Sequence, residues 1–321
     1  AAGGPPGAGA TLTFAIQNWN APQTVTVVAV DDVIVEGDHT ATISHAATGG
    51  GYDGVLIANV SATIIDNEIP GVTVTASAGG TNVNVTEGAL GQTPGATDTY
   101  TVVLACQPSA NVSVAAASAG GVTVAGPAGN NSLTFTPANW NVAQTFTVTA
   151  VDDVVVEGTH SGSISHTATG GGYFGVTISN VTATITDNDL PSVTVTETGD
   201  ATAVTEGAVA PAPGATDTYT VVLDHLPCAE VSLTVSAASQ TLVSAGGSPP
   251  GAAATLTFTT ANWSTPQTVT VRAYDDEIIE GLHTGAISHS ASGGGYTDCA
   301  IDSVIVDVTC DDISGVSIIQ S

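Results

Sequence analysis

The chain has 321 residues, of which 29 are Asp or Glu and only one is basic, so its formal net charge at pH 7 is −28. Nucleic acid and anionic membranes repel such a surface, and we expect neither as a partner. No apolar run approaches the roughly 20 residues that a membrane helix needs, so we expect no membrane insertion in this segment. A mean hydropathy of +0.31 excludes a disordered acidic chain and predicts a folded protein.

Three similar segments, rich in acids and histidines, follow one another along the chain. They read VDDVIVEGDHTATISH at 30–45, VDDVVVEGTHSGSISH at 151–166 and YDDEIIEGLHTGAISH at 274–289. An earlier half of the repeat occurs only twice, as VTEGALGQTPGATDTYTVVL from residue 85 and VTEGAVAPAPGATDTYTVVL from residue 204. Self-similarity at a constant spacing indicates tandem domains.

This register predicts four parts of the chain. Residues 1–69 form a partial domain that matches only the later strands, D to G, and residues 70–190 and 191–312 form complete domains. Residues 313–321 match the opening strand of the repeat. The first three parts are called unit 1, unit 2 and unit 3 below.

The pattern within a repeat is that of β-strands. Phe146, Val148 and Ala150 alternate with threonine and valine, and short β-branched runs are bounded by Gly, Pro and Asn. No stretch combines a helical period with helix start and stop signals. About seven short strands in some 120 residues predict an all-β fold of tandem immunoglobulin-like antiparallel β-sandwiches, the first of them incomplete.

The segments NW…PQTVTV, AVDD…EG.H…ISH and VTATITDND resemble the Calx-beta family, in the version strung in tandem through large bacterial and archaeal surface proteins and adhesins. The resemblance covers essentially the whole chain. It implies Ca²⁺ at one end of each sandwich, held by acids from three places in the repeat. Carried over by motif, the expected ligands are Glu87, Asp152, Asp153, Glu157, Asp187 and Asp189 in unit 2, Glu206, Asp275, Asp276, Glu280, Asp311 and Asp312 in unit 3, and Asp31, Asp32, Glu36 and Asp66 in unit 1.

Electrostatics favours the same site. The DD…E segment and the acids that follow the last strand converge at one pole of a sandwich, where two unit charges about 4 Å apart repel by about 4 kcal/mol at an effective dielectric constant near 20. A hard divalent cation that takes six to eight oxygen ligands removes that repulsion. The alternative is that the carboxylates only cap turns and keep the surface soluble.

The chain also departs from the family pattern. The loops after the third strand contain no acid, although Calx-beta domains usually carry one there, and Asp98 and Asp217 are candidates to supply the missing oxygen. Cys310 stands where unit 2 has Asp187. The sequence therefore leaves open whether calcium is held loosely in both complete units or is absent from unit 3.

Other motifs favour structural interpretations. His160 and His166 are too far apart on one strand, about 20 Å, to share an ion, and we expect them to be hydrogen-bonded strand residues. The GGGYDG and GGGYFG segments match GxGxxG, but no helix follows them to hold a phosphate. No catalytic constellation is unique to one copy, so we do not expect an enzyme.

In an extracellular protein, which the near absence of lysine and arginine favours, we expect the four cysteines not to stay free thiols. Cys228 and Cys299 lie in loops that share a pole of an immunoglobulin-like sandwich, and we predict a disulfide between them. Cys106 and Cys310 lie in different units and could pair only near a junction or between subunits.

Two classes of function remain. The first is a structural subunit or segment of an extracellular filament, fibre or surface stalk, built of calcium-stiffened sandwiches. Its partners would be other copies of itself, joined head to tail by donation of the strand at 315–321 to unit 1, or the chain would be a window of a longer stalk. About 45 residues of the repeat are absent before unit 1, and the tail restores only one strand. The second class is an adhesin segment that binds a carbohydrate or protein partner through its loops.

Overall fold

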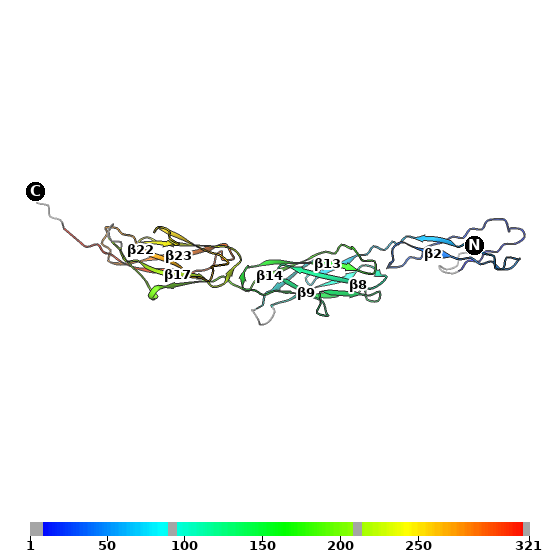
Figure 1. Cartoon of the computed structure of the whole chain (residues 1–321), viewed down its shortest axis with the longest axis horizontal. Coiled ribbons are helices and arrows are strands. Elements are labelled where there is room, and N and C mark those ends of the chain that lie inside the picture. Colours follow the sequence, from blue (N-terminus) through cyan, green and yellow to red (C-terminus); the bar gives the residue numbers. More distant parts are fainter. Residues whose placement is uncertain (1–8, 89–94, 208–213, 317–321) are drawn as a thin grey trace.

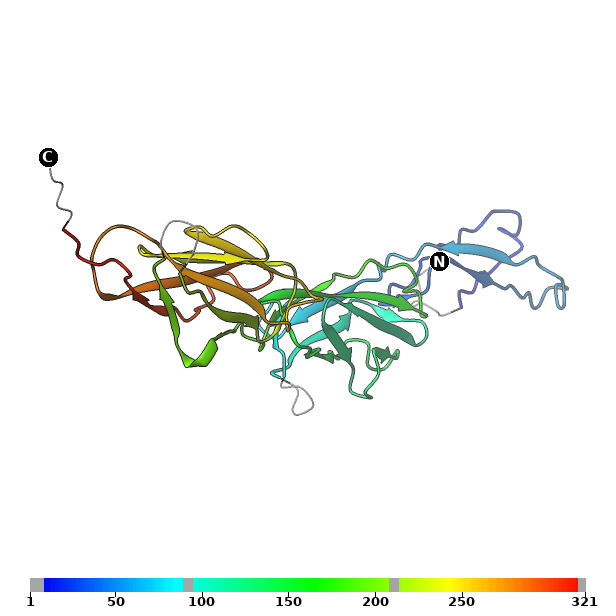
Figure 2. The same ribbon diagram turned by 60° about the vertical axis from the view of Figure 1, so that its left-hand side comes forward.

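The computed structural model describes residues 9–88, 95–207 and 214–316. The three units follow one another along the long axis of the molecule, with unit 1 and unit 3 at opposite ends (Figures 1 and 2). Secondary structure in these ranges is almost entirely β, interrupted by the short 3-10 turn η1 (Thr198–Asp200). The predicted all-β class with tandem sandwiches is confirmed.

A search of the described ranges for a membrane-spanning helix, long and apolar enough to cross a bilayer, finds none.

Unit 2 is a sandwich of a five-stranded and a four-stranded sheet. The five-stranded sheet has the order β10 (Ser132–Phe135), β8 (Val112–Ala119), β13 (His160–Thr169), β14 (Val181–Thr186) and β5 (Asn82–Thr86). The four-stranded sheet has the order β4 (Val72–Ala76), β6 (Asp98–Leu104), β11 (Gln144–Ala150) and β9 (Val122–Ala125). All pairs are antiparallel except β14 with β5, which is parallel.

Unit 3 repeats this topology. Its four-stranded sheet has the order β15 (Val193–Glu197), β17 (Asp217–Leu223), β22 (Gln267–Ala273) and β20 (Thr241–Ala245). Its five-stranded sheet has the order β16 (Thr202–Thr205), β24 (Val304–Thr309), β23 (Leu282–Ser292), β19 (Val231–Ala237) and β21 (Ala253–Phe258).

Each complete sandwich has more strands than the seven predicted, because two predicted strands are split between the sheets. In unit 2 the first strand divides into β4 and β5 at Gly79 and Gly80, and the third divides into β8 and β9 at Gly120 and Gly121. All four glycines have a positive φ, which side chains disfavour. The chain can therefore leave one sheet and join the other within a tight turn.

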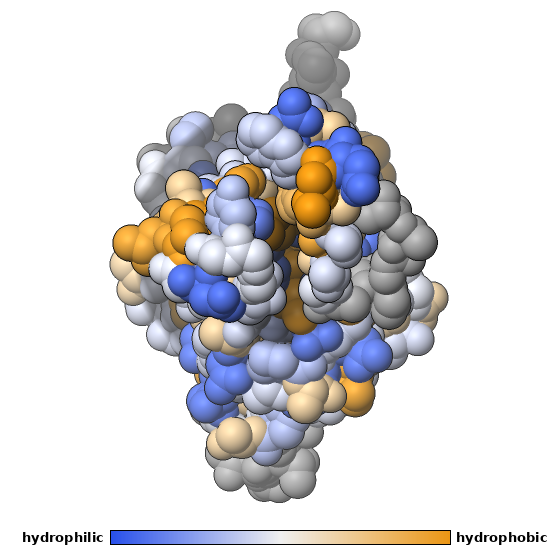
Figure 3. Space-filling view, turned by 90° about the vertical axis from the view of Figure 1, so that its right-hand side faces the viewer, coloured by the Kyte–Doolittle hydropathy of each residue, from blue (hydrophilic) through white to orange (hydrophobic). Residues whose placement is uncertain are grey.

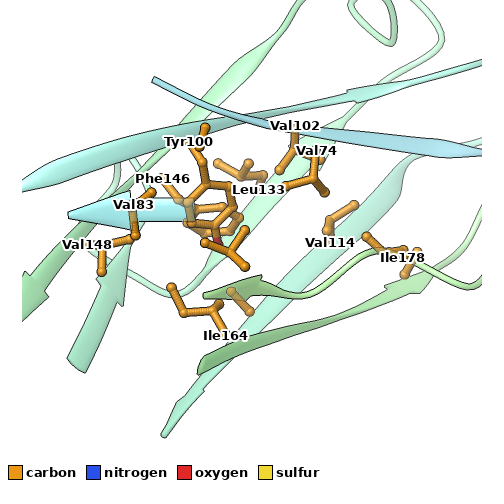
Figure 4. Packing of buried hydrophobic residues seen from close by; sticks show 14 of the residues in the cluster. Val74, Val83, Tyr100, Val102, Val114, Leu133, Phe146, Val148, Ile164 and Ile178 are labelled. Carbon is orange, nitrogen blue, oxygen red and sulfur yellow. The ribbon is translucent and has the colours of Figure 1, made fainter. Parts of the chain in front are cut away.

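The core of unit 2 is built from inward-facing valines around two aromatic rings (Figure 4). Tyr100 and Phe146 are fully buried, with ring centroids 5.3 Å apart. The Tyr100 hydroxyl donates to Nε2 of the buried His166 at 2.8 Å, and Nδ1 of His166 donates to the Ser179 carbonyl at 3.0 Å. Unit 3 repeats the first bond between Tyr219 and His289. The prediction that His166 is a hydrogen-bonded strand residue is confirmed.

Unit 1 has less regular structure. Its described strands are β2 (His39–Ile43) and β3 (Val60–Ile64), which pair antiparallel, and the two-residue strand β1 (Ile34–Val35). Many of its apolar side chains are exposed, and Figure 3 shows them among hydrophilic ones on this end of the molecule. Trp19 is 68% exposed, whereas its counterparts Trp140 and Trp263 pack against the cores of their units.

The two junctions between units have the same construction. β1 pairs in parallel with β7 (Gln107–Pro108) of unit 2, and β12 (Val155–Val156) pairs in parallel with β18 (Leu226–Pro227) of unit 3. We call β1 and β12 docking strands. The second residue of each, Val35 or Val156, is buried in the core of the next unit.

The Gly-Gly-Gly-Tyr loop of the receiving unit accommodates each docking valine. A Cβ atom added at Gly172 would lie 2.6 Å from Val35 Cγ1, and one added at Gly295 would lie 2.8 Å from Val156 Cγ1. The equivalent Gly51 of unit 1 has nothing within 4 Å of such an atom. The third glycine of this loop is therefore required by the neighbouring unit.

Alanine at the third glycine should loosen a junction only where a docking strand is present. Gly51, Gly172 and Gly295 all have a φ above +80°, so the backbone strain of alanine is matched. We expect Gly172→Ala and Gly295→Ala to broaden the distribution of molecular lengths in small-angle X-ray scattering and to expose the junction to protease. Gly51→Ala is the control, and an equal effect of all three variants would contradict this account.

Acid should weaken units 2 and 3. Burial lowers the pKa of His166 and of His289 below the usual 6.5, although a bond to a backbone carbonyl opposes the shift. The folded state therefore prefers neutral imidazole, and the contribution of these rings to stability is lost as the pH falls below 6.5. NMR titration should find both rings protonating below pH 6.5, and His166→Asn should flatten the pH dependence of melting of unit 2. Titration of either ring above 6.5 would refute the prediction.

Candidate metal centre

The acidic segment of unit 2 is held in shape by its own carboxylates. Asp153 Oδ1 accepts from the Val155 amide at 2.8 Å. Asp187 Oδ2, which follows β14, accepts from the amides of Glu157 at 2.7 Å and Gly158 at 2.8 Å. The docking strand β12 is thus fixed on both sides by aspartates.

Three carboxylates from different parts of unit 2 meet beside this segment. Ligand atoms of Glu87, Asp187 and Asp189 all lie within 4.8 Å of one another. Glu87 follows β5, and Asp187 and Asp189 follow β14, so the parallel pairing of these two strands brings their ends together. Glu87 is only 4% exposed.

Several of these oxygens are buried without a hydrogen-bond partner among the described residues. They are Glu87 Oε2, Asp152 Oδ1 and Asp189 Oδ2. A buried carboxylate oxygen without a partner is costly unless a cation or a proton lies beside it. The donor set consists of hard oxygens, which suits Ca²⁺. The residues present therefore fit the ion that the sequence predicts.

The same crowding perturbs the acids. Burial, followed by the charge of Asp187, raises the pKa of Glu87 to about 7, although the nearby His160 lowers it. Burial and the charge of Asp187 also raise the pKa of Asp189. At neutral pH the carboxylates of Glu87, Asp187 and Asp189 at this pole therefore repel one another, and a bound cation would relieve that repulsion.

His160 belongs to the same pole. Its Nε2 lies 3.3 Å from Glu157 Oε2 and 3.9 Å from Glu87 Oε1, and its Nδ1 lies 3.1 Å from the Gly158 carbonyl oxygen. Glu87, Glu157 and His160 form a second group whose ligand atoms lie within 4.8 Å. His160 was not among the ligands expected from the sequence, although the constant Glu-Gly-x-His spacing in all three repeats was the available signal.

Unit 1 builds the equivalent segment. Asp66 Oδ2 accepts from the amides of Glu36 at 2.9 Å and Gly37 at 2.6 Å, and Asp32 Oδ1 accepts from Ile34 at 2.8 Å. Asp31, Asp32, Glu36 and Asp66 line one small pocket with His39 and Glu68. Hydrogen bonding with the Glu68 side chain, followed by the Gly37 amide, lowers the pKa of Asp66 to about 2. The charged form of Asp66 therefore holds this segment.

Unit 3 differs at one ligand position. Asp276 Oδ1 accepts from the Ile278 amide at 2.8 Å, as Asp153 does for Val155. Cys310 occupies the place of Asp187, and its Sγ donates to the Ile278 carbonyl at 3.4 Å. Glu206, Cys310 and Asp312 form one group within 4.8 Å, and Glu206, Glu280 and His283 form another.

The remaining predicted acids of unit 3 lie near this pole without joining either group. Burial, followed by the charges of Asp311 and Asp275, raises the pKa of Asp312. Calcium binding by Asp275, Asp276, Asp311 and their neighbours stays a prediction.

Asp98 and Asp217 have a different environment from the one predicted. Asp98 accepts from the Thr99 amide at 2.7 Å and the Asn84 amide at 2.9 Å, and Asp217 makes the same two bonds to Thr218 and Ala203. Burial would raise the pKa of Asp98, but its hydrogen bonds together lower it. Neither residue belongs to a potential metal group of the described ranges. Each ties the start of a strand to the opposite sheet.

The predicted Cys228–Cys299 disulfide is not formed in the structure. Both residues are free thiols, with Cys228 exposed and Cys299 partly buried. Cys299 Sγ instead donates to the Pro191 carbonyl at 3.3 Å, where unit 3 begins. Burial, followed by the charge of Asp224, raises the pKa of the Cys299 thiol. A hydrogen bond to the chain thus satisfies the thiol that we expected to be oxidised.

The comparisons with known proteins give structural similarity alone. No family model matches the sequence, and no curated protein matches it. Among solved structures, the chain is similar to the calcium binding domain CBD12 of CALX1.1 and to CBD12 from CALX1.2, each at 15% identity over 68% of this chain and 79% of that chain, with TM-scores of 0.25 and 0.24. The Streptococcus agalactiae AgI/II polypeptide BspA C terminal domain is similar at 10% identity over 75% of this chain and 100% of that chain, with a TM-score of 0.23. Because these TM-scores are low, the fold assignment rests on the strand topology of the chain itself.

Glu87→Gln should change the stability of unit 2 in opposite directions with and without calcium. In chelator at pH 8, Glu87 is charged and buried, so the neutral glutamine should raise stability by about 1 to 3 kcal/mol. This gain is present above the folded pKa near 7 and disappears toward the ordinary value of 4.5, because wild-type Glu87 then becomes protonated. In millimolar calcium the variant should be the less stable protein.

Calorimetric melting at several pH values measures both effects. Glu230→Gln, at an exposed position outside the clusters, is the control. A Glu87→Gln variant that is less stable than wild type in chelator at pH 8 would show that the charge of Glu87 does not destabilise unit 2.

Proposed function

We propose that the chain is a structural segment of an extracellular filament, fibre or surface stalk whose units are stiffened by Ca²⁺. The observation that carries this proposal is the repeated junction. At both junctions, two residues of one unit extend a strand ladder into the next and place a valine in its core. Full burial of one valine contributes about 1.5 to 3 kcal/mol, which favours a single orientation between neighbouring units.

The proposed calcium site is continuous with the junction. Asp152 and Asp153 precede the docking strand Val155–Val156 directly, and Glu157 follows it. The carboxylates of Asp153 and Asp187 already hold the amides on either side. Ca²⁺ would be bound by Glu87, Asp187 and Asp189 and would supply the positive charge that these acids lack. Fixing the acids fixes the ends of the docking strand, and bending between units then becomes costly.

The proposed partners are other copies of the chain. Ile278 and Ile279 occupy the docking-strand position of unit 3, and each is 59% exposed. Their backbone is therefore available to pair with a strand of another unit, as Val155 and Val156 pair with Leu226 and Pro227. The strand at 315–321 that we expected to be donated to unit 1 lies mostly outside the described residues, and Val316 within them is 93% exposed. The exposed unit 3 pole is thus one proposed contact with a following sandwich, and strand donation to unit 1 of another copy is a second mode.

A second candidate function is adhesion through the loops. Phe174 follows the Gly-Gly-Gly-Tyr loop of unit 2 and is 87% exposed, whereas units 1 and 3 have Asp53 and Thr297 at this position. An exposed aromatic side chain in one copy alone favours a contact with a carbohydrate or protein partner. Replacing Phe174 with Thr should leave the shape of the molecule unchanged and abolish such binding.

Calcium should stiffen the molecule. At a free calcium concentration about 100 times the dissociation constant, binding to the native state alone adds about 2.7 kcal/mol to the stability of unit 2. We expect a higher melting temperature, and in small-angle scattering a narrower distribution of lengths, than in chelator. Asp189→Asn should lose both responses, whereas Asp98→Asn should keep them, because Asp98 lies outside the cluster. Melting and scattering curves that are identical in calcium and chelator would contradict the proposal.

A further inference from the structure

The pole of unit 3 has a different set of donors from that of unit 2. Where unit 2 offers Asp187, unit 3 offers the Cys310 thiol beside Glu206 and Asp312, with all three ligand atoms within 4.8 Å. Cys310 Sγ lies 4.0 Å from Asp312 Oδ2. Thiolate sulfur is a poor ligand for Ca²⁺ and Mg²⁺ but a good one for Zn²⁺ and similar metals.

Glu206 lies at the centre of this pole, and its charge is not matched by the surrounding residues. It is 2% exposed, and both of its carboxylate oxygens are buried without a hydrogen-bond partner among the described residues. It belongs to both potential metal groups of unit 3. A buried carboxylate with two unpartnered oxygens is costly, and a bound cation removes that cost.

His283 adds a nitrogen donor on the other side of Glu206. Its Nδ1 lies 3.0 Å from the Gly281 carbonyl oxygen, so that nitrogen carries the proton of the neutral ring and Nε2 presents its lone pair. Nε2 is buried without a hydrogen-bond partner in the described ranges, 3.8 Å from Glu206 Oε1 and 3.5 Å from Glu280 Oε2. A carbonyl behind a metal-binding imidazole is a common arrangement that orients the ring. Nitrogen and oxygen ligands of a tetrahedral Zn²⁺ are about 3.4 Å apart, close to the 3.5 Å between His283 Nε2 and Glu280 Oε2.

We propose that the pole of unit 3 binds Zn²⁺ or a similar divalent transition metal through Cys310, Glu206 and Asp312, with His283 Nε2 as a further donor beside Glu206. As the metal–sulfur bond forms, the Cys310 thiol proton passes to solvent, so no oxidant or reductant is needed. Sulfur at this one position directs the pole of unit 3 to a different metal from the all-oxygen group of unit 2. The inference goes beyond the proposed calcium function, because it concerns another unit and another ion.

The test uses the full chain, kept reduced, in millimolar calcium. Co²⁺ is the first probe, because a sulfur-to-cobalt charge-transfer band reports a thiolate ligand and ignores the sulfur-free group around His160. We expect one equivalent of Co²⁺ to produce that band and Zn²⁺ to displace it. Zn²⁺ titration calorimetry then gives the affinity, and calcium should compete weakly.

Three variants decide the assignment. Cys310→Ser keeps a donor for the Ile278 carbonyl and should lose the cobalt band, with Zn²⁺ affinity reduced on the order of tenfold or more. Cys310→Asp restores the unit 2 pattern and should shift the preference toward calcium. Cys228→Ser removes the exposed thiol and should change nothing.

A band that persists in Cys310→Ser, the absence of any band in the wild type, or displacement of Zn²⁺ by equimolar calcium would overturn the proposal. Failure here would leave the calcium response of unit 2 intact, so the two proposals fail separately.

Discussion

Hydrogen bonds from backbone amides to aspartate carboxylates organise the junction end of each repeat. In unit 2, Asp153 binds the amide at the start of the docking strand and Asp187 binds the two amides after it. Unit 1 makes the same bonds with Asp32 and Asp66. A segment of only two paired residues could not stay extended by itself, because a ladder that short gains too little to offset its entropy. The carboxylates supply that order, and the valine of the docking strand then reaches the core of the next unit.

This arrangement concentrates negative charge at the junction between units. The anchoring aspartates bring Glu87 and Asp189 close to Asp187, and burial removes the water that would screen them. A cation bound at this pole would therefore act on the packing of a unit and on its orientation to the next at the same time. In unit 3, Asp276 still binds the Ile278 amide, but Cys310 stands in the place of the second anchoring aspartate. Ile278 and Ile279 are exposed at the docking position.

Sequence periodicity predicted the fold class well, because alternation along the strands and a constant repeat length both reflect local geometry. It did not predict how Gly79 and Gly121 split strands between sheets, since that depends on the backbone conformation that each glycine adopts. The meeting of Asp187 with the DD…E segment followed from the expected convergence of strand ends, whereas Glu87 was expected there only from the family resemblance. The hydrogen bonds from backbone amides to Asp98 and Asp217 were not predicted, because an acid at the start of a strand satisfies backbone amides as readily as it binds an ion.

The Gly-Gly-Gly-Tyr loops show the main limit of inference from a repeated sequence. A repeat shows that a residue is needed in every copy, but not whether it serves its own unit or the next. Gly172 and Gly295 leave room for a valine from the preceding unit, and only the arrangement of units in space reveals that contact. His160 and His283 were missed for a related reason, since spacing along a strand said nothing of Glu87 and Glu206 across the sheet.

We propose that cation binding by the acids at the end of a unit and docking of that unit onto the next are coupled. Hydrogen–deuterium exchange in calcium and in chelator tests it most directly, with peptides that cover residues 154–157 and 225–228 on the two sides of the second junction. The account predicts that calcium slows exchange on both sides together, while residues 278–279 respond less because they have no partner strand. Slower exchange at the acidic segment with no change at residues 225–228 would contradict it.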